Sequence, residues 1–109
     1  MNLLNWKFST YIDNTREWAD KVFGPRNPSC IPGILAHIEE EVEEVRKKPD
    51  DLEEWVDLMI LSIDGATCAG HSPEEICEML EYKLQKNMTR QWPDWRTVEP
   101  GKPINHIKN

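Results

Sequence analysis

The stretch GILAHIEEEVEEVRKKPDDLEEWVDLMILSIDGATCA, residues 33–69, decides the fold. Apolar residues recur in its first part at steps of three and four, which predicts an amphipathic helix over residues 33–46. This stripe consists of Ile34, Leu35, Ile38, Val42 and Val45. The segment KKPDD stops the pattern, and a second helix is predicted over residues 52–69. The second helix is apolar on nearly every side, so we expect it to be buried on more than one face.

Two further helices are predicted on either side of this pair. Apolar residues with the same spacing predict a helix over residues 6–23, which ends before the segment GPRNP. The fourth helix has Ser72 as its N-cap, Pro73 at its first position and Glu75 closing a capping box, and it continues to about residue 91. The chain from about residue 92 is irregular. Because no segment alternates with period two, we predict an all-α four-helix bundle.

Length and composition restrict the kind of protein further. A chain of 109 residues predicts one domain over residues 1–109, and so small a core favours an oligomer. A net charge of −7 argues against a nucleic-acid partner, and no apolar run approaches the roughly 18 residues of a membrane span. Three cysteines without a CxxC spacing, and a start MNLLNWKFST without an apolar core, indicate a reduced, cytoplasmic protein.

The acidic residues are distributed unevenly. No Lys or Arg lies between Lys48 and Lys83, whereas ten Asp and Glu residues do. In the helix before this segment, Glu41 and Glu44 lie three residues apart at the edge of the apolar stripe, and His37 is in line with them. The remaining glutamates of that helix point away and are expected to be solvated.

The helix over residues 52–69 repeats the arrangement with Glu54 and Asp57. A short turn between antiparallel helices would bring both next to Glu41 and Glu44, and four carboxylates without a local cation predict a Mg²⁺ or Mn²⁺ site, with two or more ions plausible. Di-iron, zinc and calcium sites lack their motifs in this sequence. Asp64 is either an outer member of this site or a local cap.

The fourth helix carries a row of polar residues that continues its apolar face: Lys83, Lys86, Asn87 and Arg90. The row is either a solvated helix end, favoured by the helix dipole, or a site for an anion such as a polyphosphate or the acidic cluster. Carboxylates for a metal and cations for phosphates together favour hydrolysis of a triphosphate by activated water.

Several segments resemble one enzyme family. The motifs EEVEE (residues 40–44) and EWVD (residues 54–57) are similar to the EExxE and ExxD pair of the all-α, MazG-like nucleoside triphosphate pyrophosphohydrolases. More narrowly, FGP, GILAHIEEEVEEV, DDLEEWVDLMILSIDGA, AGHSPEEI and KNMTRQWPDWR resemble the dATP/dGTP diphosphohydrolases of phages and bacteria. This similarity covers roughly residues 23–96.

The resemblance implies that dATP and dGTP are hydrolysed to the monophosphate and pyrophosphate with Mg²⁺ or Mn²⁺. It assigns the metal to Glu41, Glu44, Glu54 and Asp57, and phosphate and sugar to Lys83, Lys86, Asn87 and Arg90. It also implies a homodimer or homotetramer with sites built from more than one subunit. A phage-encoded protein would act in the host cytoplasm.

Recognition of the base is less well defined by the sequence. A tryptophan can stack on a purine, and Trp92 and Trp95, next to the cationic row, are the best candidates. Arg96 and His37 complete the predicted substrate-binding set. Two alternatives remain: a pyrophosphatase for dUTP or dCTP, and a non-catalytic helical module whose acidic face binds a basic partner.

Overall fold

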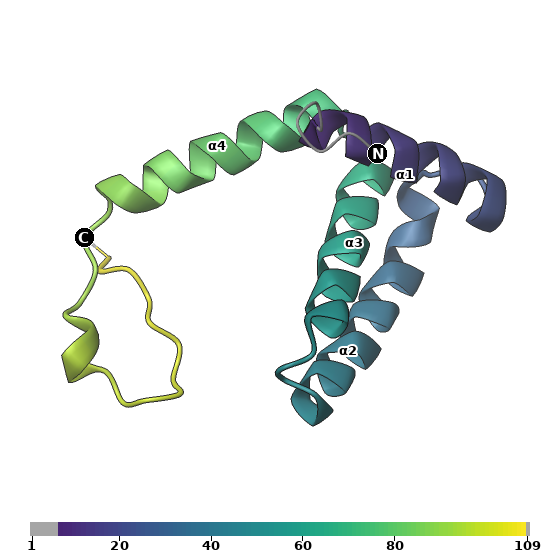
Figure 1. Cartoon of the computed structure of the whole chain (residues 1–109). Coiled ribbons are helices and arrows are strands. Elements are labelled where there is room, and N and C mark those ends of the chain that lie inside the picture. Colours follow the sequence, from purple (N-terminus) through teal and green to yellow (C-terminus); the bar gives the residue numbers. More distant parts are fainter. Residues whose placement is uncertain (1–6, 109) are drawn as a thin grey trace. The chain divides into compact units, whose positions relative to one another are not determined.

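The computed structural model describes residues 7–108, and this part of the chain is helical without any strand. Four α-helices follow one another (Figure 1): α1 (Phe8–Phe23), α2 (Ile31–Lys47), α3 (Leu52–Cys68) and α4 (Pro73–Thr89). Two short 3-10 helices, η2 (Pro28–Cys30) and η3 (Trp95–Thr97), precede α2 and follow α4. The predicted all-α fold is confirmed.

The helix ends follow from local capping. The start of the first helix was predicted at Trp6, which lies outside the described residues, and α1 ends at Gly24, whose φ of 93° favours glycine. The α2 helix begins before the predicted residue 33, because the Asn27 side chain accepts a hydrogen bond from Ser29 N–H and η2 leads directly into the helix. This early start is not visible in the apolar pattern, since capping depends on Asn27 and not on periodicity.

The α4 helix starts with the predicted capping box. The Glu75 N–H donates to Ser72 Oγ over 3.1 Å, and the Ser72 N–H donates to Glu75 Oε1 over 3.0 Å. Hydrogen bonding of the Glu75 carboxylate to the backbone N–H and the side chain of Ser72 lowers the pKa of Glu75. Both donors are therefore satisfied at this helix end, as the sequence predicted.

Helices α2 and α3 form an antiparallel pair joined by a four-residue turn, and α1 packs against α3 (Figure 1). The Asp51 side chain starts α3 by accepting from Glu53 N–H over 3.0 Å. The buried side chains come from all three helices, with Ile12 and Ala19 on α1, Ile34 and Val45 on α2, and Cys68 on α3. This packing fixes the side chains of α2 and α3 that face each other.

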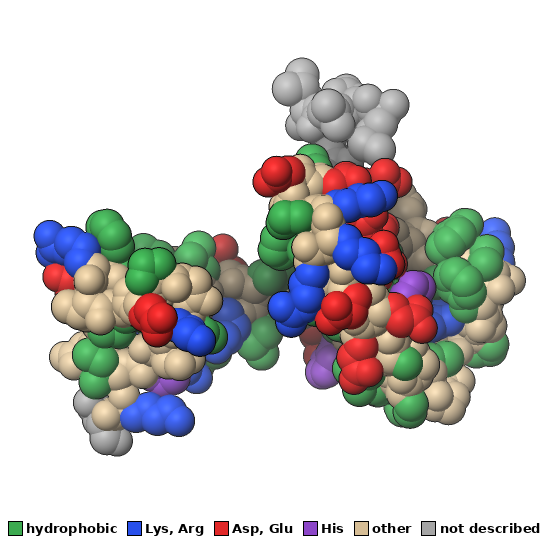
Figure 2. Space-filling view, turned by 90° about the horizontal axis from the view of Figure 1, so that it is seen from below, with side chains coloured by type: hydrophobic (Ala, Val, Ile, Leu, Met, Phe, Trp, Pro, Cys, Tyr) green, Lys and Arg blue, Asp and Glu red, His purple; other side chains and the backbone are tan. Residues whose placement is uncertain are grey.

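Within the first unit, the prediction that the third helix is buried on more than one face is wrong. Its side chains at Leu52, Met59 and Trp55 are 74%, 57% and 48% exposed. The contacts of α1 and α2 with α3 leave these side chains exposed within the first unit. Figure 2 shows hydrophobic side chains among charged ones on the visible surface of the chain. An apolar pattern predicts that a helix face is buried against another surface. It does not predict whether that surface belongs to the same chain or to a second chain.

The chain forms two compact units, residues 1–77 and 78–109. In the second unit, the end of the chain folds back to the residues that follow α4. The Ile107 N–H donates to Gln91 O over 2.8 Å, and the Trp92 and His106 rings meet edge to face. Between α4 and residue 108, η3 is the one helical element that the structure describes. No helix in residues 7–108 has the length and apolar character needed to cross a membrane.

Candidate metal site and cleft

Three of the predicted metal ligands come together in the first unit. Glu41 of α2 and Glu54 and Asp57 of α3 each bring one carboxylate oxygen within 4.8 Å of the other two. The spacing of three residues places Glu54 and Asp57 on one side of α3, and the tight turn before α3 places that side against α2. We refer to Glu41, Glu54 and Asp57 as the carboxylate cluster.

The carboxylate cluster is short of positive partners. The Oε2 atom of Glu41 is buried and has no hydrogen-bond partner among residues 7–108, while its Oε1 atom lies 3.8 Å from Nε2 of His37. Neither Glu54 nor Asp57 forms an ion pair with any residue in the described range 7–108. Desolvation raises the pKa of Glu54, and the negative charges of Glu41, Asp51, Asp57 and Glu44 raise it further.

This donor set fits a hard divalent cation. An unpaired buried carboxylate oxygen costs free energy unless it is protonated, hydrogen-bonded or bound to a cation. Mg²⁺ and Mn²⁺ prefer carboxylate oxygen, and the cluster offers three such ligands from two rigid helices. The geometry therefore suits the group that the sequence predicts.

Glu44, the fourth predicted ligand, lies one turn beyond Glu41 but outside the group of three. Its Oε1 atom is 3.7 Å from Nζ of Lys47, and its side chain is 44% exposed. An exposed ion pair of this kind contributes little to stability. The structure thus brings three of the four predicted ligands together, and the metal-binding role of all four stays a prediction.

The cluster borders a cleft of about 670 Å³ among α1, α2 and α3. Glu41, Asp57 and His37 lie on its wall, and most of the remaining lining is apolar. The apolar lining includes Ala19, Ile34, Ile60 and Leu61, together with Trp18 and Phe23, whose rings meet edge to face at 5.3 Å. A largely apolar cleft of this size with a small number of charged groups is typical of a small-molecule site.

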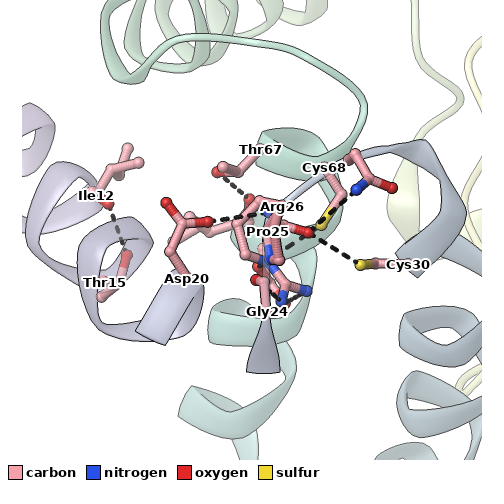
Figure 3. Close-up of polar contacts among 12 residues, drawn as sticks. Ile12, Thr15, Asp20, Gly24, Pro25, Arg26, Cys30, Thr67 and Cys68 are labelled. Atoms are coloured by element: carbon pink, nitrogen blue, oxygen red, sulfur yellow. Dashed lines mark hydrogen bonds and ion pairs between the residues drawn. The ribbon is translucent and has the colours of Figure 1, made fainter. Parts of the chain in front are cut away.

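The same cleft holds an ion pair that the sequence did not predict. The Nε atom of Arg26 lies 3.0 Å from Oδ1 of Asp64, and its Nη2 atom donates to Oδ2 over 3.1 Å. Only 5% of the Arg26 side chain and 21% of the Asp64 side chain is exposed. Arg26 also donates from Nη1 to Gly24 O, and its backbone N–H donates to Asp20 (Figure 3).

Cys68 lies beside this pair, with its Sγ atom 3.9 Å from Oδ1 of Asp64. Burial raises the pKa of the Cys68 thiol, and Arg26 opposes this shift. The sequence offered one signal for the pair: Asp64 follows Asp57 by seven residues on the same helix face and has no cation on its own helix. Its partner Arg26 lies 38 residues earlier, in the GPRNP turn. A turn has no periodic apolar pattern, so the sequence does not predict which residue Arg26 contacts.

The predicted substrate-binding residues other than His37 belong to the second unit. Asn87 accepts at Oδ1 from Arg90 Nη1 over 3.0 Å and at its backbone carbonyl from Trp92 Nε1 over 2.8 Å. The Nζ atom of Lys86 lies 5.8 Å from the centre of the Tyr82 ring. The structure thus groups part of the row around Asn87.

The remaining residues of this set are more exposed. Lys83 is exposed, and the Trp95 side chain is 72% exposed. Arg96 is paired with Asp94 through two short contacts, 2.9 Å from Nε and 2.7 Å from Nη2. A substrate role for these residues, and for His37, stays a prediction.

The fold and the site together define an all-α protein with clustered carboxylates on the wall of a small-molecule cleft. Residues 11–109 match the family model described as dATP/dGTP pyrophosphohydrolase. The chain belongs to this family, and the predicted resemblance is confirmed. The family name denotes hydrolases that release pyrophosphate, which supports an enzymatic role.

One curated relative comes from a phage. The chain is 39% identical over 92 residues to a protein of Salmonella phage P22 described as Eaa protein. The matched region covers 84% of this chain and 27% of the phage protein, so the chain spans about a quarter of that relative. No solved structure matches the chain.

Proposed function

We propose that this chain is a metal-dependent pyrophosphohydrolase that converts dATP and dGTP to the monophosphate and pyrophosphate. One observation carries the proposal: in a member of the dATP/dGTP pyrophosphohydrolase family, Glu41, Glu54 and Asp57 cluster without a Lys or Arg partner in the described chain, and Glu41 and Asp57 line a cleft. Such a cluster suits a divalent cation, and the adjoining cleft suits a nucleotide.

In this proposal Glu41, Glu54 and Asp57 hold Mg²⁺ or Mn²⁺, and Glu44 turns from Lys47 to complete the set. Four carboxylates are enough for two or more ions. When bound, the ions neutralise phosphate charge and make a water molecule more acidic. A water oxygen attacks the α-phosphorus, the bond from that phosphorus to the bridging oxygen breaks, and pyrophosphate leaves with the bonding electrons while one proton is released.

The other predicted residues bind the substrate in this scheme. Lys83, Lys86 and Arg90 neutralise charge on the leaving pyrophosphate, and Asn87 binds phosphate or sugar. Aromatic and polar residues then bind the rest of the nucleotide: Trp92, Trp95, Arg96 and His37. The reaction consumes nucleotides of the cytoplasm, which is the host cytoplasm if a phage encodes the chain.

The test is to incubate the protein with each deoxynucleoside triphosphate in Mg²⁺ or Mn²⁺ and to separate the products. We expect dAMP or dGMP with pyrophosphate, and no product in EDTA. Preference for dUTP or dCTP would shift the proposal to a pyrimidine enzyme. Absence of turnover for every nucleotide would leave the acidic interaction module as the better description.

We also propose a homodimer or homotetramer. The exposed flank of α3, with Leu52 and Met59 more than half exposed, supports this assembly because a second copy would cover it. Light scattering is expected to give two or four times the chain mass of 12.8 kDa. A mass of one chain at micromolar concentration would contradict it.

A further inference from the structure

The cleft has a second polar end opposite the carboxylate cluster. Asp57 and Asp64 both line it and lie seven residues apart on α3, which is two helical turns or about 10 Å along the axis. Glu41 and Ile34 line the α2 side with the same separation. The two helices are aligned accordingly, because a Cβ atom at Gly65 would lie 3.6 Å from Ile34 Cγ2. The cleft therefore runs along the helices from the carboxylate cluster to Asp64.

Much of the wall between the two ends is apolar, although Arg16 of α1 and His37, which lies between Ile34 and Glu41 on α2, also line the cleft. Ile60 and Leu61 of α3 and Trp18 of α1 line this stretch. The groups of a nucleotide follow one another in a matching order. Its phosphates lie at one end, the flat face of the base lies in the middle, and the hydrogen-bonding groups lie on the far edge of the base. With the phosphates at the carboxylate cluster, the far edge of a purine would reach Asp64. This orientation rests on the proposed function.

The hydrogen-bonding capacity at this second end is specific. An ionised carboxylate only accepts hydrogen bonds and offers about four lone-pair positions. Arg26 donates from Nη2 to Oδ2 of Asp64 over 3.1 Å, and Cys68 donates from Sγ to Oδ1 over 3.9 Å, so one position on each oxygen is occupied. The Nε atom of Arg26 adds an ion-pair contact with Oδ1 at 3.0 Å that lacks hydrogen-bond geometry. Asp64 stays 21% exposed whereas Arg26 is 5% exposed, so Asp64 presents its remaining acceptors to the cleft. The ion pair also fixes the plane of the carboxylate.

We propose that Asp64 determines base specificity and selects guanine. The far edge of guanine presents two adjacent donors, the ring N1–H and the exocyclic 2-amino group, which match the two oxygens of one carboxylate. Adenine presents one amino donor beside an unprotonated ring nitrogen, which a carboxylate repels. Asp64 therefore accepts two hydrogen bonds from guanine and at most one from adenine.

Binding of the monophosphates tests this assignment without requiring turnover. Calorimetry with the unmodified chain and Mn²⁺ compares dGMP, dIMP, which lacks only the 2-amino group, and dAMP. We expect dIMP and dAMP to bind at least about tenfold more weakly than dGMP, which is the effect of one hydrogen bond to a charged group. Equal affinity for dGMP and dIMP, tighter binding of dAMP, or no binding of any of the three would overturn the proposal.

A variant with a matched control locates the effect. In Asp64→Asn the preference for dGMP over dIMP should fall to less than about threefold, because the amide offers one acceptor oxygen in place of two. Asp20→Asn is the control: Asp20 also bonds to Arg26, at its backbone N–H, but does not line the cleft. It should keep the preference of the unmodified chain, and the same loss in both variants would overturn the assignment.

The two proposals fail separately. If the chain prefers dGMP over dIMP but hydrolyses no triphosphate, the hydrolase proposal is wrong and the role of Asp64 in binding stands. If the chain hydrolyses dATP and dGTP but does not distinguish dGMP from dIMP, the role of Asp64 is wrong. Should Asp64→Asn fail to fold, the comparison of the three nucleotides on the unmodified chain decides alone.

Discussion

The two ends of the cleft carry the same functional group on the same face of one helix, and of these two aspartates only Asp64 is paired with an arginine. Asp57 lies with Glu41 and Glu54 and has no ion-pair partner in the described chain, whereas Asp64, two turns further on, is held by buried Arg26. The comparison shows that neighbours, and not residue type, decide what a carboxylate does. Without a cation it suits a metal ion; neutralised by arginine it becomes a fixed acceptor.

The largest effect should come from removing a carboxylate at the end without a cation. Asp57→Asn should lower kcat for dGTP by at least about a hundredfold, because a lost metal ligand removes charge stabilisation in the transition state. Product release assays and circular dichroism would check activity and fold. Glu53→Gln, an exposed carboxylate on the same helix, is the control and should keep near-normal activity.

The next effect concerns the end with the arginine. Arg26→Met should lower the free energy of unfolding by about 3 kcal/mol, because Asp64 is left partly buried without its counter-charge. Urea denaturation measures this change, with the exposed Arg16→Met as control. Adding Asp64→Asn to Arg26→Met should restore part of the loss. Additive losses in the double variant would show that the ion pair does not couple the two residues.

The effect of a metal ion on the free energy of unfolding tests which end of the cleft binds the ion. At about 100 times its dissociation constant, Mn²⁺ should raise the free energy of unfolding by about 2.7 kcal/mol. Thermal melting should show this gain for the unmodified chain and for Asp64→Asn, and not for Asp57→Asn. If Asp64→Asn also loses the gain, both ends of the cleft contribute to one metal site.

The smallest effect is one of pH in the metal-free chain. Desolvation and nearby carboxylates hold the pKa of Glu54 above its ordinary value of 4.5, so folding favours its protonated form. Its contribution to stability is present below the ordinary value and is lost as pH rises through the raised pKa. Glu54→Gln in EDTA should therefore melt higher than the unmodified chain at pH 7, with the difference shrinking near pH 4. A difference in melting temperature that stays constant from pH 4 to pH 7 would contradict repulsion between Glu54 and the nearby carboxylates.

The parts of the structure that depend on local chemistry could be predicted from the sequence. The capping box of Ser72 and Glu75 is fixed within one helical turn, and Glu54 and Asp57 share a face because they are three residues apart. Glu41 joins them because the turn between the helices is short. The all-α fold followed from the same periodicities.

The parts that depend on distant neighbours could not be predicted. Arg26 reaches Asp64 only because α1 ends at Gly24 and the chain turns back toward α3, and no periodic signal encodes such a meeting. The exposed flank of α3 was missed for a related reason: Leu52 and Met59 are apolar, but the sequence does not say what covers them. Local rules placed the metal ligands, and tertiary contacts placed the acceptor at the other end.

The burial of Cys68 has a practical consequence. Its thiol is completely shielded from solvent next to the ion pair of Arg26 and Asp64, whereas Cys30 and Cys77 are partly accessible. An alkylating reagent can reach Cys68 only when this part of the first unit opens, so its reaction rate equals the opening equilibrium constant multiplied by the rate for a free thiol. The chain thus carries its own reporter of local opening, and occupation of the cleft should slow that one modification while leaving the other two cysteines unchanged.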